Sequence, residues 1–248
     1  MKPAIVICLL AAASFASCQE KQKEAPVMID HTIPAGAPRA AAAAANVQAA
    51  LERDLTAMGL EFGDLVFIRV FKDQNQLELF VRNRVTAKFD LFRTYPIAAA
   101  SGVPGPKLEE GDGQVPEGFY NVTPAAMKPD SQFHLAFNIG FPNEYDRAHQ
   151  RTGSCIMVHG NCVSVGCLAM TDEKIEEIYT LCAAVLDAGQ AGFRVHIFPF
   201  RMTGEAMAKV TGNSNEGFWK NLREGYDFFE KNHVPPVVSV VAGRYHFK

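Results

Sequence analysis

The sequence has no apolar run long enough to cross a bilayer, which takes roughly 20 residues. Its N-terminal run, from Ala4 to Phe15, is too short. It also lacks a basic block, an RNA-binding aromatic signature and a dinucleotide-binding glycine motif, and its formal net charge is only −3. Nucleic acid is therefore not expected as a partner. There is no internal repeat, and no CxxC pair of the kind found in common structural zinc sites.

The N-terminus is typical of an exported protein. A cationic head, the short apolar run and the small pair Ala16-Ser17 predict a secretory signal in residues 1–17. Cys18 makes this segment similar to a bacterial lipoprotein signal, in which the cysteine is acylated and becomes the first residue. The alternative is an ordinary cleaved signal that contains a cysteine. Both interpretations place the protein in the periplasm or cell envelope, and Gln19 after an acylated Cys18 favours anchoring to an outer membrane.

A low-complexity segment follows the signal. Residues 18–45 contain three prolines, an alanine run and few large apolar side chains. Such a segment buries too little surface to offset its loss of chain entropy, which predicts a flexible tether. An extension packed on the domain is the alternative, because Val27, Met28 and Ile29 are adjacent. Residues 46–248 are enough for one domain with a substantial core.

That domain is predicted to be mainly β, of the α+β class, with peripheral helices and a C-terminal extension of helix and strand. Apolar or alternating runs predict strands at 64–71, 76–82, 89–98, 118–123, 133–139, 155–160, 193–200 and 237–241. Helical spacing of apolar residues predicts helices at 46–59, 171–189 and 215–233. Residues 101–117 contain too many breakers for regular structure, and long loops of that kind are often functional.

Four cysteines fall within the domain: Cys155, Cys162, Cys167 and Cys182. Export makes disulfides the first alternative, and four cysteines allow three full pairings among which the sequence cannot choose. Zinc held by Cys155, His159, Cys162 and Cys167 is the second. On one strand, however, the Cα atoms of Cys155 and His159 would lie about 13 Å apart. The third is a nucleophile, since a thiol needs a base or a positive environment to become the attacking thiolate.

The stretch "VHGNCVSVGCLAMTD" (158–172) resembles the active-site signature of the L,D-transpeptidase catalytic (YkuD-type) family, His-Gly followed by Ser-x-Gly-Cys. The similarity is greatest to its YafK-like branch of periplasmic murein L,D-transpeptidases. It continues through "SGVPGPKLEEGDGQVPEGFYNVTP", "FHLAFNIGFPNEYDRAHQRTG" and "VHIFPFRM", and so covers roughly residues 63–203. The resemblance implies a YkuD-like β-rich fold, no cofactor and no metal.

The same resemblance implies the roles of the motif residues. Cys167 is the nucleophile and His159 the general base and acid. Gly160 and Ser164 shape the turn, and the backbone N–H groups of Gly166 and Cys167 face the developing oxyanion. The sequence departs from the wider family at Val165, where a histidine is usual, and in the "LAM" that follows Cys167.

The implied substrates are peptidoglycan stem peptides that contain diaminopimelate, whose carboxylates suit bidentate binding by arginine. Arg151 is the first candidate for this binding, and the others are His134, Asn138, Tyr145 and His149. The alternative is a solvated loop with local hydrogen bonds.

The overall prediction is an exported, lipid-anchored enzyme that forms an acyl-enzyme and passes the acyl group to an amine or to water. Its partners would be stem peptides, a wall-attached lipoprotein and, through the anchor, a membrane. A non-catalytic wall-binding lipoprotein and a zinc-dependent hydrolase are the competing hypotheses.

Overall fold

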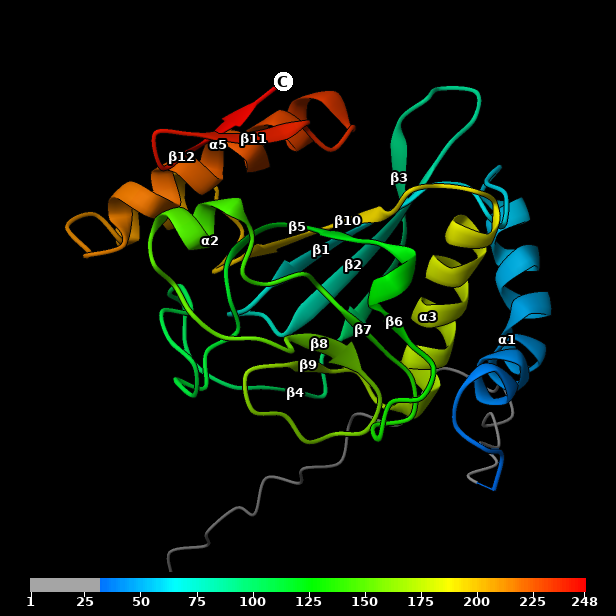
Figure 1. Ribbon diagram of the computed structural model, residues 1–248. Coiled ribbons are helices and arrows are strands. Elements are labelled where there is room, and N and C mark those ends of the chain that lie inside the picture. The colour runs from blue at the N-terminus through cyan, green and yellow to red at the C-terminus, as the bar shows by residue number, and fades with distance from the viewer. Residues whose placement is uncertain (1–31) are drawn as a thin grey trace, which may run out of the picture.

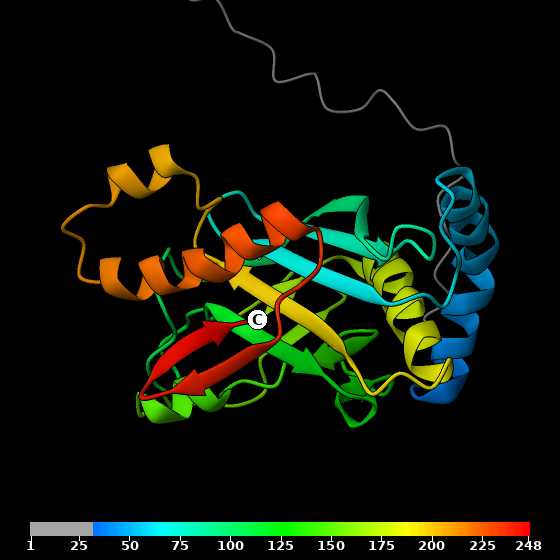
Figure 2. The same cartoon turned by 90° about the horizontal axis from the view of Figure 1, so that it is seen from above.

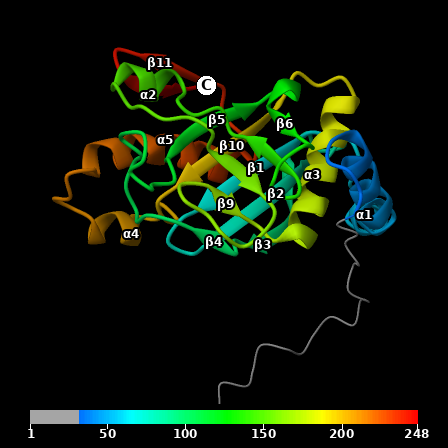
Figure 3. The ribbon, with the colours of Figure 1, turned by 60° about the horizontal axis from the view of Figure 1, so that its bottom comes forward.

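The computed structural model describes residues 32–248. Two five-stranded sheets stack face to face, as Figures 1 and 3 show. The first has the order β3 (Phe89–Pro96), β2 (Gln76–Arg82), β1 (Val66–Phe71), β10 (Phe193–Phe198) and β5 (Gly118–Val122). The second has the order β4 (Ala99–Ala100), β9 (Leu168–Ala169), β8 (Met157–His159), β7 (Ala136–Asn138) and β6 (Met127–Lys128). The prediction of a mainly β domain of the α+β class is confirmed.

The alternation of side chains along β1 explains why the first sheet is covered on both faces. Every residue of this strand is buried. Val66, Ile68 and Val70 join the main core, which also receives side chains from the second sheet. Phe67 and Phe71 belong to separate clusters that include side chains of helix α5 (Glu216–Asn232). A strand buried on both faces is rich in apolar residues, as β1 is. Its one charged residue, Arg69, is buried in ion pairs with Glu78 and Glu230.

Helix α1 (Ala37–Ala57) corrects the predicted boundary of the tether, because residues 37–45 are helical rather than flexible. Alanine has the highest helix propensity, so the run that looked like low-complexity linker forms the first turns of a helix. Ala43 is fully buried, and Arg39 donates hydrogen bonds from Nη1 to the carbonyl oxygens of Ser131 and His134. The predicted signal at 1–17 and Cys18 lie outside the described residues.

The longer helices lie at one end of the sheets and over one face of the first sheet. In Figure 2, α1 lies beside α3 (Asp172–Asp187) at one end, and α5 lies over the first sheet. On α5 the residues Leu222, Tyr226 and Phe229, at helical spacing, are buried, and Phe218 of the same series is partly buried against them. The short helices α2 (Glu144–Ala148) and α4 (Gly204–Lys209), a 3₁₀ turn (Pro124–Ala126) and the hairpin β11 (Val238–Val241)–β12 (Arg244–Phe247) complete the domain. Within residues 32–248, no helix has the length and apolar character needed to span a membrane.

Candidate active site

Strands β8 and β9 bring His159 and Cys167 to one face of the second sheet. The strands are parallel, with His159 opposite Ala169, and Cys167 immediately precedes β9. Successive side chains on a strand point to opposite faces, so Cys167 lies on the same side as Ala169 and therefore as His159. Cys167 therefore lies two residues before the residue that pairs with His159. The motif thus places a thiol and an imidazole on a shared surface.

The Cys167 thiol is partly buried and protonated at rest. Its Sγ lies 3.5 Å from the carbonyl oxygen of Cys155, to which it donates, and accepts from the backbone N–H of Met157 at 3.4 Å. Burial raises the pKa of Cys167, while the Met157 N–H and the ammonium of Lys107 act in the opposite direction. A thiol in this state needs a base before it can attack a carbonyl.

The His159 ring meets the requirement for such a base. Its Nδ1 lies 2.6 Å from the carbonyl oxygen of Gly160, so in the neutral ring Nδ1 donates and Nε2 keeps its lone pair. Burial lowers the pKa of His159, which keeps the imidazole neutral at pH 7. The Phe133 ring lies 4.8 Å away and packs against it. Among the described residues no hydrogen bond joins the His159 ring to Cys167; such catalytic bonds often tighten only in the substrate complex.

Two glycines allow the close approaches in this turn. Gly166 has a φ of +82°, a left-handed conformation that favours glycine. At Gly160, a Cβ would lie 2.5 Å from Oδ1 of Asp172 and 2.8 Å from the carbonyl oxygen of Phe133. A side chain at either position would therefore distort the loop that carries the nucleophile.

The two N–H groups expected to face an oxyanion already have acceptors. Gly166 N–H donates to Oγ of Ser101 at 2.5 Å, and Cys167 N–H donates to Oγ of Ser164 at 3.0 Å. Ser164 in turn donates to the Cys167 carbonyl oxygen at 2.6 Å, which closes the turn. An oxyanion role for these N–H groups thus requires the Ser101 and Ser164 hydroxyls to move aside.

The breaker-rich loop 101–117 supplies two site residues that sequence reasoning missed, Ser101 and Lys107. The Lys107 side chain is 4% exposed and donates from Nζ to Oδ1 of Asp112 at 2.6 Å and to the carbonyl oxygen of Glu109 at 2.9 Å. It is close enough to Cys167 to lower the pKa of the thiol. The loop was expected to be functional, but no local pattern within it distinguishes Lys107 from a surface lysine.

Arg151 does not have the predicted role of a free carboxylate-binding group. Its Nη1 donates to Oδ1 of Asp146 at 2.9 Å, and both side chains are buried. The guanidinium also lies 4.5 Å from the ring centre of Phe218 and 5.1 Å from that of Tyr145. These contacts make Arg151 part of the packing beneath α2, and the first candidate for substrate binding is corrected on this ground.

The other four substrate-binding candidates also make local contacts. His134 Nε2 lies 2.8 Å from a carboxylate oxygen of Glu176. Asn138 accepts from Gly140 N–H at 2.8 Å. The Tyr145 ring stacks on the His149 ring at 4.1 Å. Of these residues, His134 lies nearest the catalytic motif, because its Cβ would meet a Cβ at position 160 at 3.0 Å. The two α2 candidates, Tyr145 and His149, thus contact each other.

The four domain cysteines all lie in the described part of the chain. Cys155, Cys162, Cys167 and Cys182 are free thiols, and Cys182 is buried on α3, where burial raises its thiol pKa well above the ordinary value. Within residues 32–248 no three or more His, Cys, Asp or Glu side chains come together as a metal site would require. The nucleophilic interpretation is the one that the geometry supports.

Comparisons with known proteins identify the family of this chain. The family model for the L,D-transpeptidase catalytic domain, YkuD, matches residues 66–197. The candidate L,D-transpeptidase YafK of Escherichia coli, in strains K12 and O157:H7, is 45% identical over 183 residues, which is 74% of this chain and 74% of YafK. This chain therefore belongs to the L,D-transpeptidase catalytic domain family, and the expected YkuD-like fold and YafK-like relationship are confirmed.

More distant likenesses are found among solved structures. The helical cell shape determining protein Pgp2 from Campylobacter jejuni is 16% identical, with a TM-score of 0.41 over 76% of this chain and 79% of that one. Bd1075 of Bdellovibrio bacteriovorus is 22% identical, with a TM-score of 0.38 over 67% of this chain and 56% of that one. Likenesses at this level carry no argument about function.

Proposed function

We propose that this protein is an exported cysteine acyltransferase and hydrolase of peptidoglycan, acting on stem peptides that contain diaminopimelate. The observation that carries the proposal is the placement of Cys167 and His159 on one face of β8 and β9. Membership of the L,D-transpeptidase family supplies the substrate class. The free thiol also argues against a non-catalytic wall-binding lipoprotein, which has no need of one.

The chemistry follows from the state of the two side chains. His159 Nε2 takes the proton of the Cys167 thiol as Sγ attacks the amide carbonyl, and the C–N bond then breaks. The protonated imidazole gives its proton to the leaving amine, which leaves a thioester acyl-enzyme and a neutral His159. An incoming amine or water repeats the sequence in reverse: His159 removes its proton, the new bond forms at the carbonyl, and the thiol is regenerated.

Hydrolysis is proposed to compete strongly with transfer. Transfer requires an amine to reach the acyl-enzyme before water does, so the acceptor side needs a shaped, partly dry groove. Only residues 160–166 connect His159 to Cys167, which leaves little chain to build such a wall. Val165, where the wider family has a histidine, is 83% exposed. The favoured scissile bond joins diaminopimelate to the lysine of a wall-attached protein or to another stem.

The location proposed for this activity is the periplasm or cell envelope. The signal predicted in residues 1–17 supports export, and Cys18 supports a lipid anchor in the outer membrane. A substrate that is part of the cell wall requires an enzyme on that side of the inner membrane, which agrees with both features.

The test is incubation of purified protein with sacculi, followed by mass spectrometry of the muropeptides and of released protein. The proposal expects free tripeptide ends and released polypeptide with the native protein, and neither with Cys167→Ala. A product mixture of new 3–3 cross-links without released protein would assign the activity chiefly to transfer. Unchanged products with Cys167→Ala would remove this cysteine from the mechanism.

A further inference from the structure

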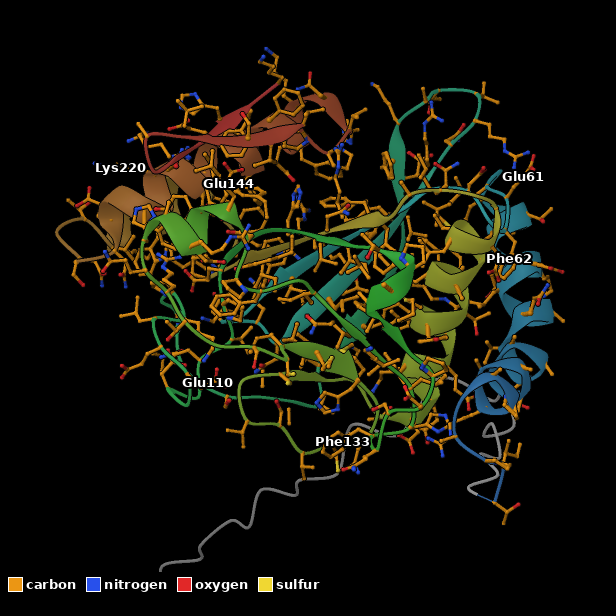
Figure 4. The ribbon with its side chains drawn as sticks, viewed as in Figure 1. Glu61, Phe62, Glu110, Phe133, Glu144 and Lys220 are labelled. Atoms are coloured by element: carbon orange, nitrogen blue, oxygen red, sulfur yellow. The ribbon has the colours of Figure 1, made fainter. Side chains whose placement is uncertain are left out.

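A cavity separate from the catalytic motif lies beneath the C-terminal hairpin. Its accessible volume is about 380 Å³, and it lies between β5 and β10 of the first sheet, α2, and β11. Volumes of this order are typical of sites for small molecules. In Figure 4, Glu144, which lines the cavity, is far from Phe133, whose ring contacts His159. The cavity is therefore at the other end of the domain from the catalytic base.

The charge of the cavity wall is positive. Arg147 and Arg194 both line it, and neither forms an ion pair with any described residue. Arg194 donates from Nη1 to the carbonyl oxygens of Pro235 and Pro236, at 2.6 and 2.9 Å, which holds its guanidinium at the hairpin. Burial lowers the pKa of Arg194, as expected for a desolvated cation without an acid partner. One exposed carboxylate, Glu144, lines the cavity and does not balance two arginines.

A buried histidine adds an unpartnered polar group to this wall. His196 is 1% exposed, lines the cavity, and has an Nδ1 with no hydrogen-bond partner in the structure. Its ring is held between Phe67 and Phe119, at 4.6 and 4.7 Å between ring centres. Buried polar groups are nearly always paired, so an orphaned ring nitrogen beside a cavity indicates a missing partner.

Two further polar side chains in the wall have no hydrogen-bond partner among the described residues. The Asn121 side chain and the Ser239 hydroxyl line the cavity and form no hydrogen bond with any described residue. The rest of the wall is largely apolar, with Pro236, Val238 and Val240 on the hairpin side. A ligand that fits has an acidic group for the arginines, other polar atoms for the amide and hydroxyl, and an apolar or peptide body.

We propose that this cavity is a binding site for a small carboxylate-bearing ligand, distinct from the Cys167 site. Guanidinium groups bind carboxylates through charge-assisted hydrogen bonds. Arg147 Nη1 donates to the carbonyl oxygen of Pro142 and Arg194 Nη1 to those of Pro235 and Pro236, which leaves the other N–H groups of both side chains for a ligand. Such a ligand is either a free dicarboxylic acid or the carboxylate-rich peptide of the cell wall. The site accounts for two arginines and a histidine that the proposed acyl transfer does not use.

The experiment is a ligand titration of the full-length Cys167→Ala protein, a variant chosen so that no turnover occurs. The protein carries labelled histidine, and binding is monitored in ¹H–¹³C spectra of the imidazole rings. Succinate is one probe, and the tripeptide L-alanyl-γ-D-glutamyl-meso-diaminopimelate is the other. The expected result is a saturable shift of the His196 resonance, which the His196→Gln variant assigns. Tighter binding of the tripeptide would identify wall peptide as the source, and equal binding of succinate a free acid.

Matched variants separate a site from general charge attraction. Arg147→Gln removes a lining cation and should weaken binding about tenfold or more, the effect of one lost charge-assisted hydrogen bond. Arg244→Gln removes the same charge from the nearby C-terminal hairpin, but Arg244 does not line the cavity, so binding should change less than about twofold. Equal weakening by both variants, or no saturable shift with either probe, would overturn the proposal. Neither outcome bears on whether Cys167 turns over sacculi.

Discussion

Substitution of Arg151 by methionine distinguishes a structural role from substrate binding. The substitution removes one partner of a buried ion pair, because Arg151 Nη1 and Asp146 Oδ1 are 2.9 Å apart and the Asp146 side chain is 0% exposed. Leaving one charge of a buried pair without its partner costs about 3–5 kcal/mol. In a domain of this size each kcal/mol lowers Tm by about 2–4 °C, so the expected fall is about 6–20 °C.

The control for this experiment is the exposed neighbour Arg147. Arg147→Met removes the same charge four residues earlier and should change the free energy of unfolding by no more than about 0.5 kcal/mol. The assay is thermal or urea unfolding of both variants, together with kcat and KM on sacculi-derived peptides below their unfolding transitions. If Arg151→Met leaves Tm unchanged and raises KM, Arg151 binds substrate and the structural assignment is refuted.

The pH dependence of the Arg151→Met effect provides a second readout. Burial already raises the pKa of Asp146, and loss of Arg151 raises it further. A carboxyl group whose pKa is higher in the folded than in the unfolded state favours folding below its unfolded pKa, and this stability is lost as pH rises through the folded pKa. The variant should therefore be less destabilised at pH 4.5 than at pH 7. A larger deficit at pH 4.5 would contradict the assigned ion pair.

The remaining predictions concern the catalytic site and the N-terminus. Cys167→Ala should abolish turnover without unfolding the protein, His159→Ala should cost about as much, and Cys162→Ser should be far milder; a dead Cys162→Ser would mean the wrong cysteine was chosen. The acid limb of kcat/KM should lie below the ordinary histidine pKa of 6.5, because burial lowers the pKa of His159 and the base stays neutral as pH falls; a limb above 6.5 would contradict this. Lys107→Met should shift the pH midpoint for iodoacetamide alkylation of Cys167 upward, because its ammonium lowers the thiol pKa, and an unmoved midpoint would deny that role. Mass spectrometry of mature protein should find acylated Cys18 at its start, and a detergent-independent protein cut elsewhere would remove the anchor.

The placement of the candidate pair, Cys167 and His159, could be predicted from the sequence because it depends on local features. The His-Gly and Gly-Cys steps lie within one short segment, and strand alternation with the parallel pairing of β8 and β9 places both side chains on one face. The strand pattern of the first sheet was predictable for the same reason, since alternation and apolar runs record which faces are buried.

The burial of the substrate-binding candidates could not be predicted from the sequence, because exposure of a polar side chain depends on distant partners. Arg151 is buried by Phe218 of α5, and His134 is paired with Glu176 of α3, contacts that no local pattern records. Lys107 could not be predicted as a site residue either, because the path of the 101–117 loop, and not any local pattern, brings it close to Cys167. The alanine run has the low complexity of a linker, but alanine also has the highest helix propensity, and residues 37–45 are helical.

In the resting site the Cys167 thiol is protonated and the N–H groups beside it are already hydrogen-bonded, and both features bear on which substrates react. The raised pKa of Cys167 and the lowered pKa of His159 both favour the neutral pair over an ion pair. At the same time the Ser101 and Ser164 hydroxyls accept from the two N–H groups that would stabilise an oxyanion. A substrate carbonyl must therefore compete for these donors before charge develops on its oxygen, and binding energy from the rest of the stem peptide is what can favour that exchange. A small carbonyl compound lacks that binding energy, so the arrangement favours acylation by an extended peptide.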